Sequence, residues 1–164
     1  FFMLCLWHIL FINTMANTFF TEAQQQQIVE AIRLAELNTS GEIRVHIEAK
    51  CAGDAYERAK HVFGELGMHA TELKNGVLFY LAYADKKFGI LGDKGIHEKV
   101  SQKFWDEENT LLLSHFKQQK FAEGLCLAIE QAGEKLKHHF AYQSDDVNEL
   151  SNEISCGNNG GSNA

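Results

Sequence analysis

Apolar residues recur along this chain at two different periods, which predict helices and strands respectively. Spacings of three and four residues are typical of amphipathic helices, and such stripes lie over about residues 21–37, 54–66, 96–116 and 121–140. Two of these segments open with a capping-box sequence, at Thr21 and at Asp54, in which a side chain accepts hydrogen bonds from free N–H groups of the first turn. Four helices are therefore expected.

Three other segments are predicted to be strands. Residues 42–49 alternate between apolar and polar side chains, which predicts one buried face and one solvated face. Residues 77–84 are apolar without alternation, as in a strand covered on both faces. The connection from there to residues 88–91 is too short for a crossover, so these two strands should be antiparallel. A helix joins the first strand to the second, which predicts that they are parallel.

These elements predict a single α/β domain. Its 164 residues are enough for one hydrophobic core and too few for two ordinary ones. We expect a three-layer α/β/α sandwich, in which a small mixed sheet is flanked by about four helices.

The two ends of the chain differ in composition from its middle. Residues 1–14 are strongly apolar, but they are shorter than the ~20 residues of a membrane span and lack the basic start of a signal peptide. We interpret them as an upstream segment before Met15 and expect a cytoplasmic protein; the alternative is a truncated signal for export. Residues 15–143 form the predicted domain, and 144–164 are acidic and then rich in Gly and Asn, typical of a flexible tail.

The formal net charge is −7, from 15 basic and 22 acidic residues. This acidity argues against a nucleic-acid-binding protein and against binding to an anionic membrane surface. The cysteines show neither a Cys-x-x-Cys pair nor zinc-ligand spacing, and we interpret them as ordinary thiols. They are Cys5, Cys51, Cys126 and Cys156.

The strand directions bring three loops to one edge of the predicted sheet. The first two strands begin at this edge and the third ends there, so Glu42, Asn75 and Asp93 should lie near one another. Carboxylate and amide oxygens are the ligands that Ca²⁺ and Mg²⁺ prefer. These three residues are therefore candidate metal ligands.

The same edge carries a glycine-rich sequence at the start of a helix. Gly92, Lys94 and Gly95 are candidates for binding an anion such as phosphate, because such a loop exposes backbone N–H groups. Asp93 and His97 are candidate catalytic residues, and the histidine could transfer a proton near neutral pH. A cation beside an anion site is the minimum for metal-assisted hydrolysis of a phosphate ester.

Structural roles explain the same residues equally simply. The two glycines suit a tight turn, and Asp93 suits a helix N-cap. Glu42 and His46 lie on the polar face of the first strand, where they would merely be solvated.

The residues around this edge form three blocks that resemble those of the TPM domain. The blocks are GEIRV at 41–45, NGVLFYL at 75–81 and FGILGDKGIHE at 88–98, and the resemblance extends over about residues 20–142. It implies an α/β/α sandwich whose site involves the block residues Glu42, Asn75, Gly76, Gly92, Asp93 and Gly95. Calcium has been associated with this domain, and a plant member resembles an acid phosphatase of the thylakoid lumen.

The chain is most similar to the short soluble bacterial members of that family. Many members have Asp where this chain has Asn75 and an aromatic residue where it has Asp93. The first difference removes a carboxylate and the second adds one.

Two functions are consistent with these features. The first is a divalent-metal-dependent, phosphatase-like hydrolase of phosphate monoesters. The alternative is a non-catalytic accessory module that binds a protein partner, since some relatives are accessory proteins. The polar face of the first strand and the acidic residues 145–153 would then be its contact surfaces.

Overall fold

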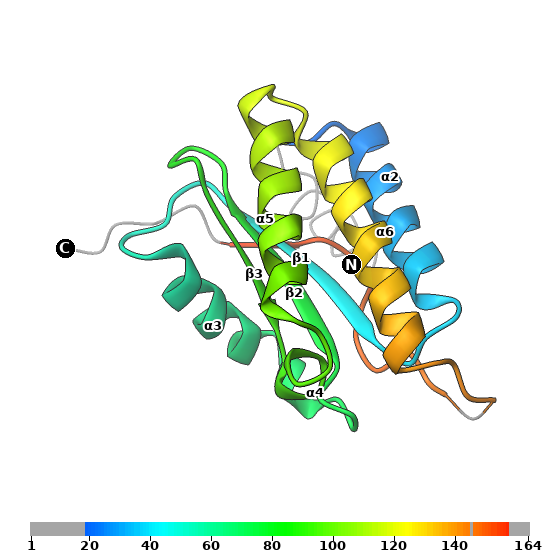
Figure 1. Ribbon diagram of the computed structural model, residues 1–164. Coiled ribbons are helices and arrows are strands. Elements are labelled where there is room, and N and C mark those ends of the chain that lie inside the picture. Colours follow the sequence, from blue (N-terminus) through cyan, green and yellow to red (C-terminus); the bar gives the residue numbers. More distant parts are fainter. Residues whose placement is uncertain (1–18, 145, 158–164) are drawn as a thin grey trace, which may run out of the picture.

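The computed structural model describes residues 19–144 and 146–157, which form three layers around one mixed sheet (Figure 1). The strand order is β3-β2-β1-β4. β1 is parallel to β2 and to β4, and β2 is antiparallel to β3. The strands are β1 (Glu42–Glu48), β2 (Gly76–Ala82), β3 (Lys87–Gly92) and β4 (Ser155–Cys156).

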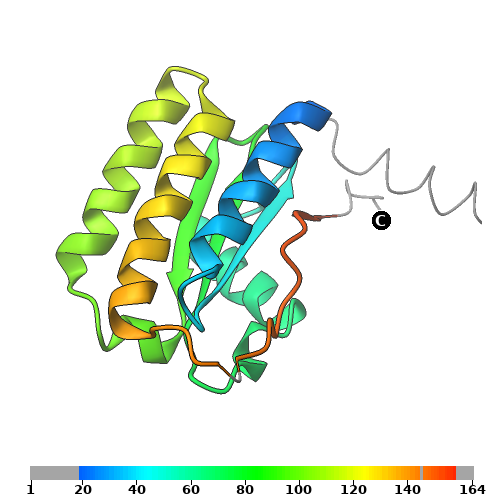
Figure 2. The ribbon, with the colours of Figure 1, turned by 90° about the vertical axis from the view of Figure 1, so that its right-hand side faces the viewer.

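Helices cover both faces of the sheet. α2 (Glu22–Glu36), α5 (Gln102–Lys117) and α6 (Phe121–His139) pack on one face, and α3 (Ala55–Glu65) packs on the other (Figures 1 and 2). The short helices η1 (Met68–Ala70) and α4 (Lys94–His97) lie at one end of the sheet. The predicted three-layer sandwich is confirmed.

Local sequence explains where two of the helices begin. The Thr21 hydroxyl accepts a hydrogen bond from the Gln24 N–H at 3.2 Å, and the Gln24 side chain accepts one from the Thr21 N–H at 3.0 Å. Asp54 Oδ1 accepts from the N–H groups of Tyr56 and Glu57 at 2.9 and 3.0 Å. These caps satisfy first-turn donors that a helix cannot satisfy itself.

The helix expected over 96–116 is two helices. α4 ends at His97, and α5 begins at Gln102 after a short connection. None of the helices in the described ranges is long and apolar enough to cross a membrane.

The face of β1 that was expected to be solvated is buried. Every residue of β1 is buried, and the exposed fractions of Glu42 and His46 are only 3% and 5%. Alternation predicted correctly which side chains point away from the α2 layer. It could not show that distant residues cover them.

Part of the cover is the C-terminal segment, residues 146–157, which runs along β1 (Figure 2). The sequence predicts a flexible tail here, whereas the structure pairs Ser155 with His46 and Cys156 with Ile47. Leu150 packs against the α3-side core and Ile154 against the α2-side core. These two apolar residues lie four positions apart in an acidic stretch. Their packing explains why composition alone did not predict that this segment is ordered against β1.

One carboxyl group lies inside the core without a partner. Glu108 of α5 is fully buried, and neither of its side-chain oxygens has a hydrogen-bond partner in the described part of the chain. Burial raises the pKa of Glu108 to about 8. The folded state therefore keeps this proton to a higher pH than the unfolded state, and the free energy of unfolding falls as pH rises from about 4.5 to 8.

We expect Glu108→Gln to remove this contribution. Between pH 5 and pH 8.5 the wild-type free energy of unfolding should fall by about 3 kcal/mol more than that of the variant, measured by urea denaturation. Glu130→Gln, which removes the same charge from an exposed position on α6, is the matched control and should keep the wild-type pH slope. Equal slopes in the wild type and Glu108→Gln would contradict this account.

Gly95 holds α4 against the loop before β2. A Cβ atom at Gly95 would lie 2.2 Å from the carbonyl oxygen of Leu73 and 2.6 Å from that of Lys74. We expect Gly95→Ala to lower the free energy of unfolding by about 2 kcal/mol, because backbone must move to admit the methyl group. Gly64→Ala, in open space on α3, should instead raise it by about 0.5 kcal/mol. A neutral Gly95→Ala would refute the close approach.

Candidate functional site

The three predicted loops do meet at one edge of the sheet. Glu42 lies opposite Gly76 in the parallel pair, and Val77 lies opposite Gly92 in the antiparallel pair. The N–H of Asp93 donates to the Gly76 carbonyl at 2.8 Å. Glu42, Gly76 and Asp93 therefore form one row across β1, β2 and the end of β3.

Each candidate metal ligand is held by one of its polar atoms. Glu42 Oε1 accepts from the N–H of Glu149 at 2.7 Å. The Asn75 amide nitrogen donates to the Ser40 carbonyl at 3.1 Å. Asp93 Oδ1 accepts from the N–H of Lys94 at 2.8 Å, and so caps α4.

The second oxygen of each candidate ligand is buried and without a partner. Glu42 Oε2, Asn75 Oδ1 and Asp93 Oδ2 accept no hydrogen bond from the described residues. Thr71 Oγ1, at the end of η1 and fully buried, is in the same condition. Buried polar atoms are nearly always paired, so four unpaired oxygens from neighbouring loops are unusual.

These oxygens do not form a compact acidic cluster. Glu42 and Asp93 are two strands apart in their row, which separates their Cα atoms by about 10 Å. Above Gly76, the Met68 methyl group and the Phe63 ring lie 3.3 and 3.5 Å from where a Cβ would be. Across residues 19–144 and 146–157, no three His, Cys, Asp or Glu side chains come together in a way that could hold a metal ion. A cation here would need the neutral oxygens of Asn75 and Thr71 as well.

Burial controls the charge of the acids around Glu42. It raises the pKa of Glu42 to about 7 and that of Glu36 to about 8. The N–H groups that they bind oppose this rise, because hydrogen bonds to a carboxylate stabilise its charged form. A cleft of about 320 Å³ between the end of α2 and the C-terminal segment is lined by both carboxyl groups and opens to solvent.

Asp93 lies beside a histidine other than the predicted one. The exposed His97 ring lies nearly parallel to the Trp105 ring, with their centres 6.5 Å apart. His69 Nδ1 is instead 3.6 Å from Asp93 Oδ1. The exposed imidazole of His69 therefore lies beside the Asp93 carboxylate.

The predicted anion-binding residues are largely engaged within the protein. The N–H of Lys94 binds Asp93, and the N–H of Ile96 donates to the Lys74 carbonyl at 3.3 Å. Gly92 lies under the Trp105 ring, whose carbons are 2.7 Å from where a Cβ would be. The Lys94 side chain is exposed, with Nζ 3.8 Å from Glu98 Oε1. The Lys94 ammonium group is therefore a charged group of the predicted set that faces solvent.

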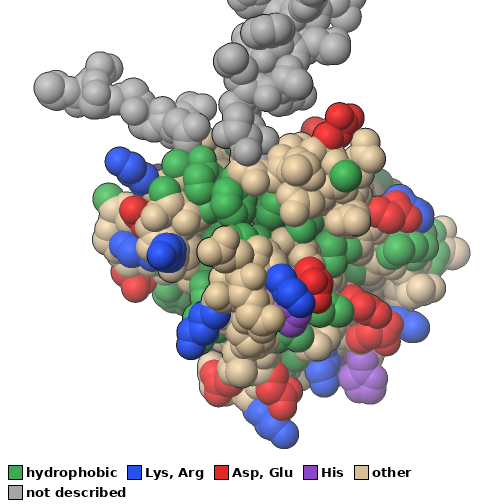
Figure 3. Space-filling model, turned by 90° about the horizontal axis from the view of Figure 1, so that it is seen from above, with side chains coloured by type: hydrophobic (Ala, Val, Ile, Leu, Met, Phe, Trp, Pro, Cys, Tyr) green, Lys and Arg blue, Asp and Glu red, His purple; other side chains and the backbone are tan. Residues whose placement is uncertain are grey.

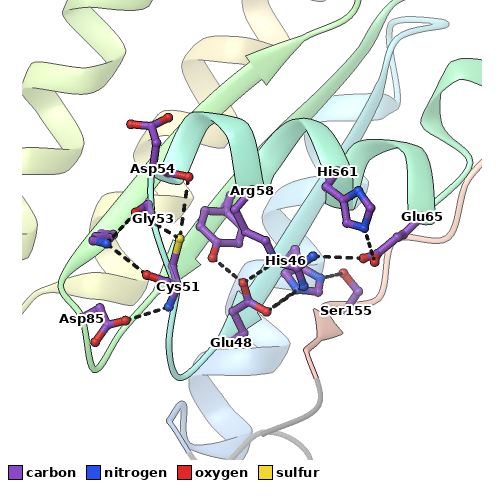
Figure 4. A network of polar contacts seen from close by, with 12 residues as sticks. His46, Glu48, Cys51, Gly53, Asp54, Arg58, His61, Glu65, Asp85 and Ser155 are labelled. Carbon is purple, nitrogen blue, oxygen red and sulfur yellow. Dashed lines mark hydrogen bonds and ion pairs between the residues drawn. The ribbon is translucent and has the colours of Figure 1, made fainter. Parts of the chain in front are cut away.

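A second polar network lies under α3 (Figure 4). Glu48 accepts two hydrogen bonds from Arg58, each 2.9 Å, and a third from the Tyr80 hydroxyl. Burial acts to raise the pKa of Glu48, but these hydrogen bonds outweigh it and the pKa is lowered. Glu48 is thus a satisfied buried carboxylate, in contrast to Glu42.

The opposite end of the molecule shows a mixed surface over the residues that the structure describes. Around the α5–α6 connection, basic, acidic and apolar side chains are interspersed over the described surface (Figure 3). The unpaired buried oxygens of Glu42, Asn75 and Asp93 make their edge the better candidate site.

Two residues at this edge, Thr71 and His69, were not predicted from the sequence. They lie in the connection between α3 and β2 and belong to no recognisable motif. The 3.6 Å approach of His69 Nδ1 to Asp93 Oδ1 depends on how that connection folds back, which a local sequence pattern cannot predict.

Comparisons with known proteins agree with this architecture. The chain is similar to the NMR structure of BA42 protein from the psychrophilic bacterium Bizionia argentinensis, with 47% identity and a TM-score of 0.81. The match covers 88% of this chain and 99% of that one. The N-terminal domain of cg2496 protein from Corynebacterium glutamicum shares the fold, with a TM-score of 0.58 at 17% identity, over 72% of this chain and 74% of that one. Among curated proteins, none matches.

The family model of the TPM domain matches residues 14–135, about three quarters of the chain. The three sequence blocks at the edge lie inside this region. The chain therefore belongs to the TPM-domain family.

Proposed function

We propose that the edge formed by Glu42, Asn75 and Asp93 binds a divalent cation, Ca²⁺ or Mg²⁺, and that the protein hydrolyses phosphate monoesters there. The observation that carries the proposal is that each of these residues keeps one buried oxygen without a partner. A buried oxygen without a hydrogen bond costs about 1–3 kcal/mol. A bound cation would offset that cost.

The chemistry of the four oxygens favours a hard cation. All are acceptors, and two belong to carboxylates and two to an amide and a hydroxyl. Such mixed oxygen ligands suit Ca²⁺, which accepts about six to eight of them in flexible geometry, better than zinc, which prefers nitrogen and sulfur. Glu42, Thr71, Asn75 and Asp93 would hold the ion, with water completing its shell.

A cation at this edge would polarise a phosphoryl oxygen and lower the charge that repels a nucleophile. Two other groups of the chain would assist. The Lys94 ammonium group reaches solvent next to Asp93 and can attract a phosphate dianion. His69, 3.6 Å from Asp93, can hold or release a proton on the same side.

Cation binding is expected to depend on Asp93. Calorimetric titration of the chain with Ca²⁺ and with Mg²⁺ should give saturable binding at millimolar or lower concentration. Asp93→Asn, which retains an N-cap residue, should weaken it about tenfold or more. Asp106→Asn, an exposed carboxylate on α5, is the matched control and should bind like the wild type. No binding at millimolar metal, or equal binding by Asp93→Asn, would refute the metal site.

Hydrolysis of a phosphate monoester should depend on Asp93 and on the metal, as cation binding does. We expect hydrolysis of para-nitrophenyl phosphate to require added Ca²⁺ or Mg²⁺, to stop with chelator and to be lost in Asp93→Asn. His69→Gln should lower the rate about a hundredfold, the usual size of a general acid or base effect, whereas His61→Gln on α3 should not.

The variant His97→Gln decides between the two histidines at this edge, since a loss of rate in that variant alone would assign the proton transfer to His97. Metal binding without turnover in the wild type would contradict the hydrolase and leave the cation site standing.

A further inference from the structure

β1 has an edge that is only partly paired with another strand. On one side it pairs with β2 along all seven residues, whereas on the other side, within residues 19–144 and 146–157, two of its residues pair with β4. The Gly157 N–H adds one backbone bond to the Ile47 carbonyl at 2.8 Å. Open edges of this kind accept an added strand readily, so proteins usually cover them.

Side chains take the place of a full partner strand over the rest of this edge. Glu36 Oε1 accepts from the Ile43 N–H at 2.7 Å, and the Ser155 hydroxyl donates to the Val45 carbonyl at 3.2 Å. Both β1 groups are main-chain groups that a longer strand would bind directly. The C-terminal segment therefore lies along this edge of β1 but pairs with it as a strand over only part of its length.

The segment is recognised through a small number of polar contacts. Glu42 accepts from the Glu149 N–H, Glu36 Oε2 accepts from the Asn152 amide at 2.8 Å, and His46 Nδ1 lies 2.9 Å from the Ser155 hydroxyl (Figure 4). Leu150 and Ile154 provide the apolar contacts described above. These contacts lie within the seven residues 149–155, ELSNEIS.

The segment leaves part of the polar row beneath it unsatisfied. Arg44 Nε and His46 Nε2 are buried without a hydrogen-bond partner in the described residues, although His46 Nε2 lies 3.9 Å from Glu48 Oε2 in a longer polar contact. Glu153, which the register places next to Arg44, is exposed. The C-terminal segment thus leaves some hydrogen-bonding groups of Arg44 and His46 unpaired, whereas buried polar groups are normally paired.

We propose that the edge of β1 is a binding site for an extended segment of a partner protein, and that residues 146–157 are its resident, displaceable occupant. The incoming segment adds as a strand parallel to β1, with backbone hydrogen bonds supplying affinity and side chains supplying specificity. It carries apolar residues at the positions of Leu150 and Ile154, an amide at that of Asn152 and a hydroxyl at that of Ser155.

This proposal goes beyond the cation site and does not depend on hydrolysis. It also explains why both surfaces that the sequence nominates for a partner, the polar face of β1 and the acidic tail, contact each other in the folded chain. In the free protein, the polar face of β1 and the C-terminal segment bind each other, and a competing segment would replace the second.

The test uses the full chain and a fluorescent peptide of residues 146–157 with Cys156→Ser, which removes the peptide's own thiol. A tethered segment competes at an effective concentration of about 1 mM, so the peptide should bind the wild type weakly. The doubly substituted chain Asn152→Ala, Ile154→Ala holds its own segment less tightly, and we expect it to bind the peptide about tenfold more tightly by fluorescence anisotropy. Val147→Ala, an exposed position in the same segment, is the matched control and should bind like the wild type.

Displacement is measured separately in the wild type, which avoids any folding defect of the variant. Excess peptide should speed alkylation of Cys156 about fivefold, in line with mass action, and leave Cys51 and Cys126 unchanged, as resolved by mass spectrometry of digested chain. A peptide with Asn152→Ala and Ile154→Asp should have no effect. Unchanged Cys156 alkylation at saturating peptide, or equal peptide affinity for the wild type and the doubly substituted chain, would overturn the proposal.

Discussion

The burial of the polar face of β1 is the constraint on which the rest of this structure depends. A central strand that carries Glu42, Arg44, His46 and Glu48 toward one layer of the protein must find partners for them, because unpaired buried charges are costly. The Arg58 guanidinium and the Tyr80 hydroxyl satisfy Glu48. The C-terminal segment serves Glu42 and His46. The two ends of the strand thus have different chemistry: a satisfied carboxylate at one end and a carboxyl group with a free oxygen at the other.

This difference distinguishes polar groups with a structural role from those that are candidates for binding a ligand. Where a buried carboxylate has both oxygens paired, as in Glu48, its hydrogen bonds fix α3 on the sheet. Where oxygens are left free, as at Glu42, Asn75 and Asp93, the fold carries a cost that a bound cation would remove. Glu42 takes part in both the proposed cation site and the contact with the C-terminal segment, since one of its oxygens binds the Glu149 N–H and the other has no partner among the described residues. Occupancy of the two sites is therefore expected to be coupled through this side chain.

Much of the fold could be predicted from the sequence because its signals are local. The capping boxes at Thr21 and Asp54, the alternation in β1 and the short β2–β3 connection each report a nearby backbone geometry. The sheet edge that collects Glu42, Asn75 and Asp93 followed from strand directions alone. Contacts between distant segments could not be predicted in the same way. The cover over His46 comes from Ser155, 109 residues away, and the imidazole beside Asp93 comes from His69 because an irregular connection folds back.

The central claim is that the free oxygens at the sheet edge bind one cation together. NMR of the side-chain carboxyl and amide groups during a Ca²⁺ titration tests it most directly, because each proposed ligand reports separately. The signals of Glu42, Asp93 and Asn75 should shift along one common binding curve, while the satisfied carboxylate of Glu48 stays unchanged. Shifts confined to exposed acids such as Glu149 and Glu153, or separate curves for Glu42 and Asp93, would contradict a shared site.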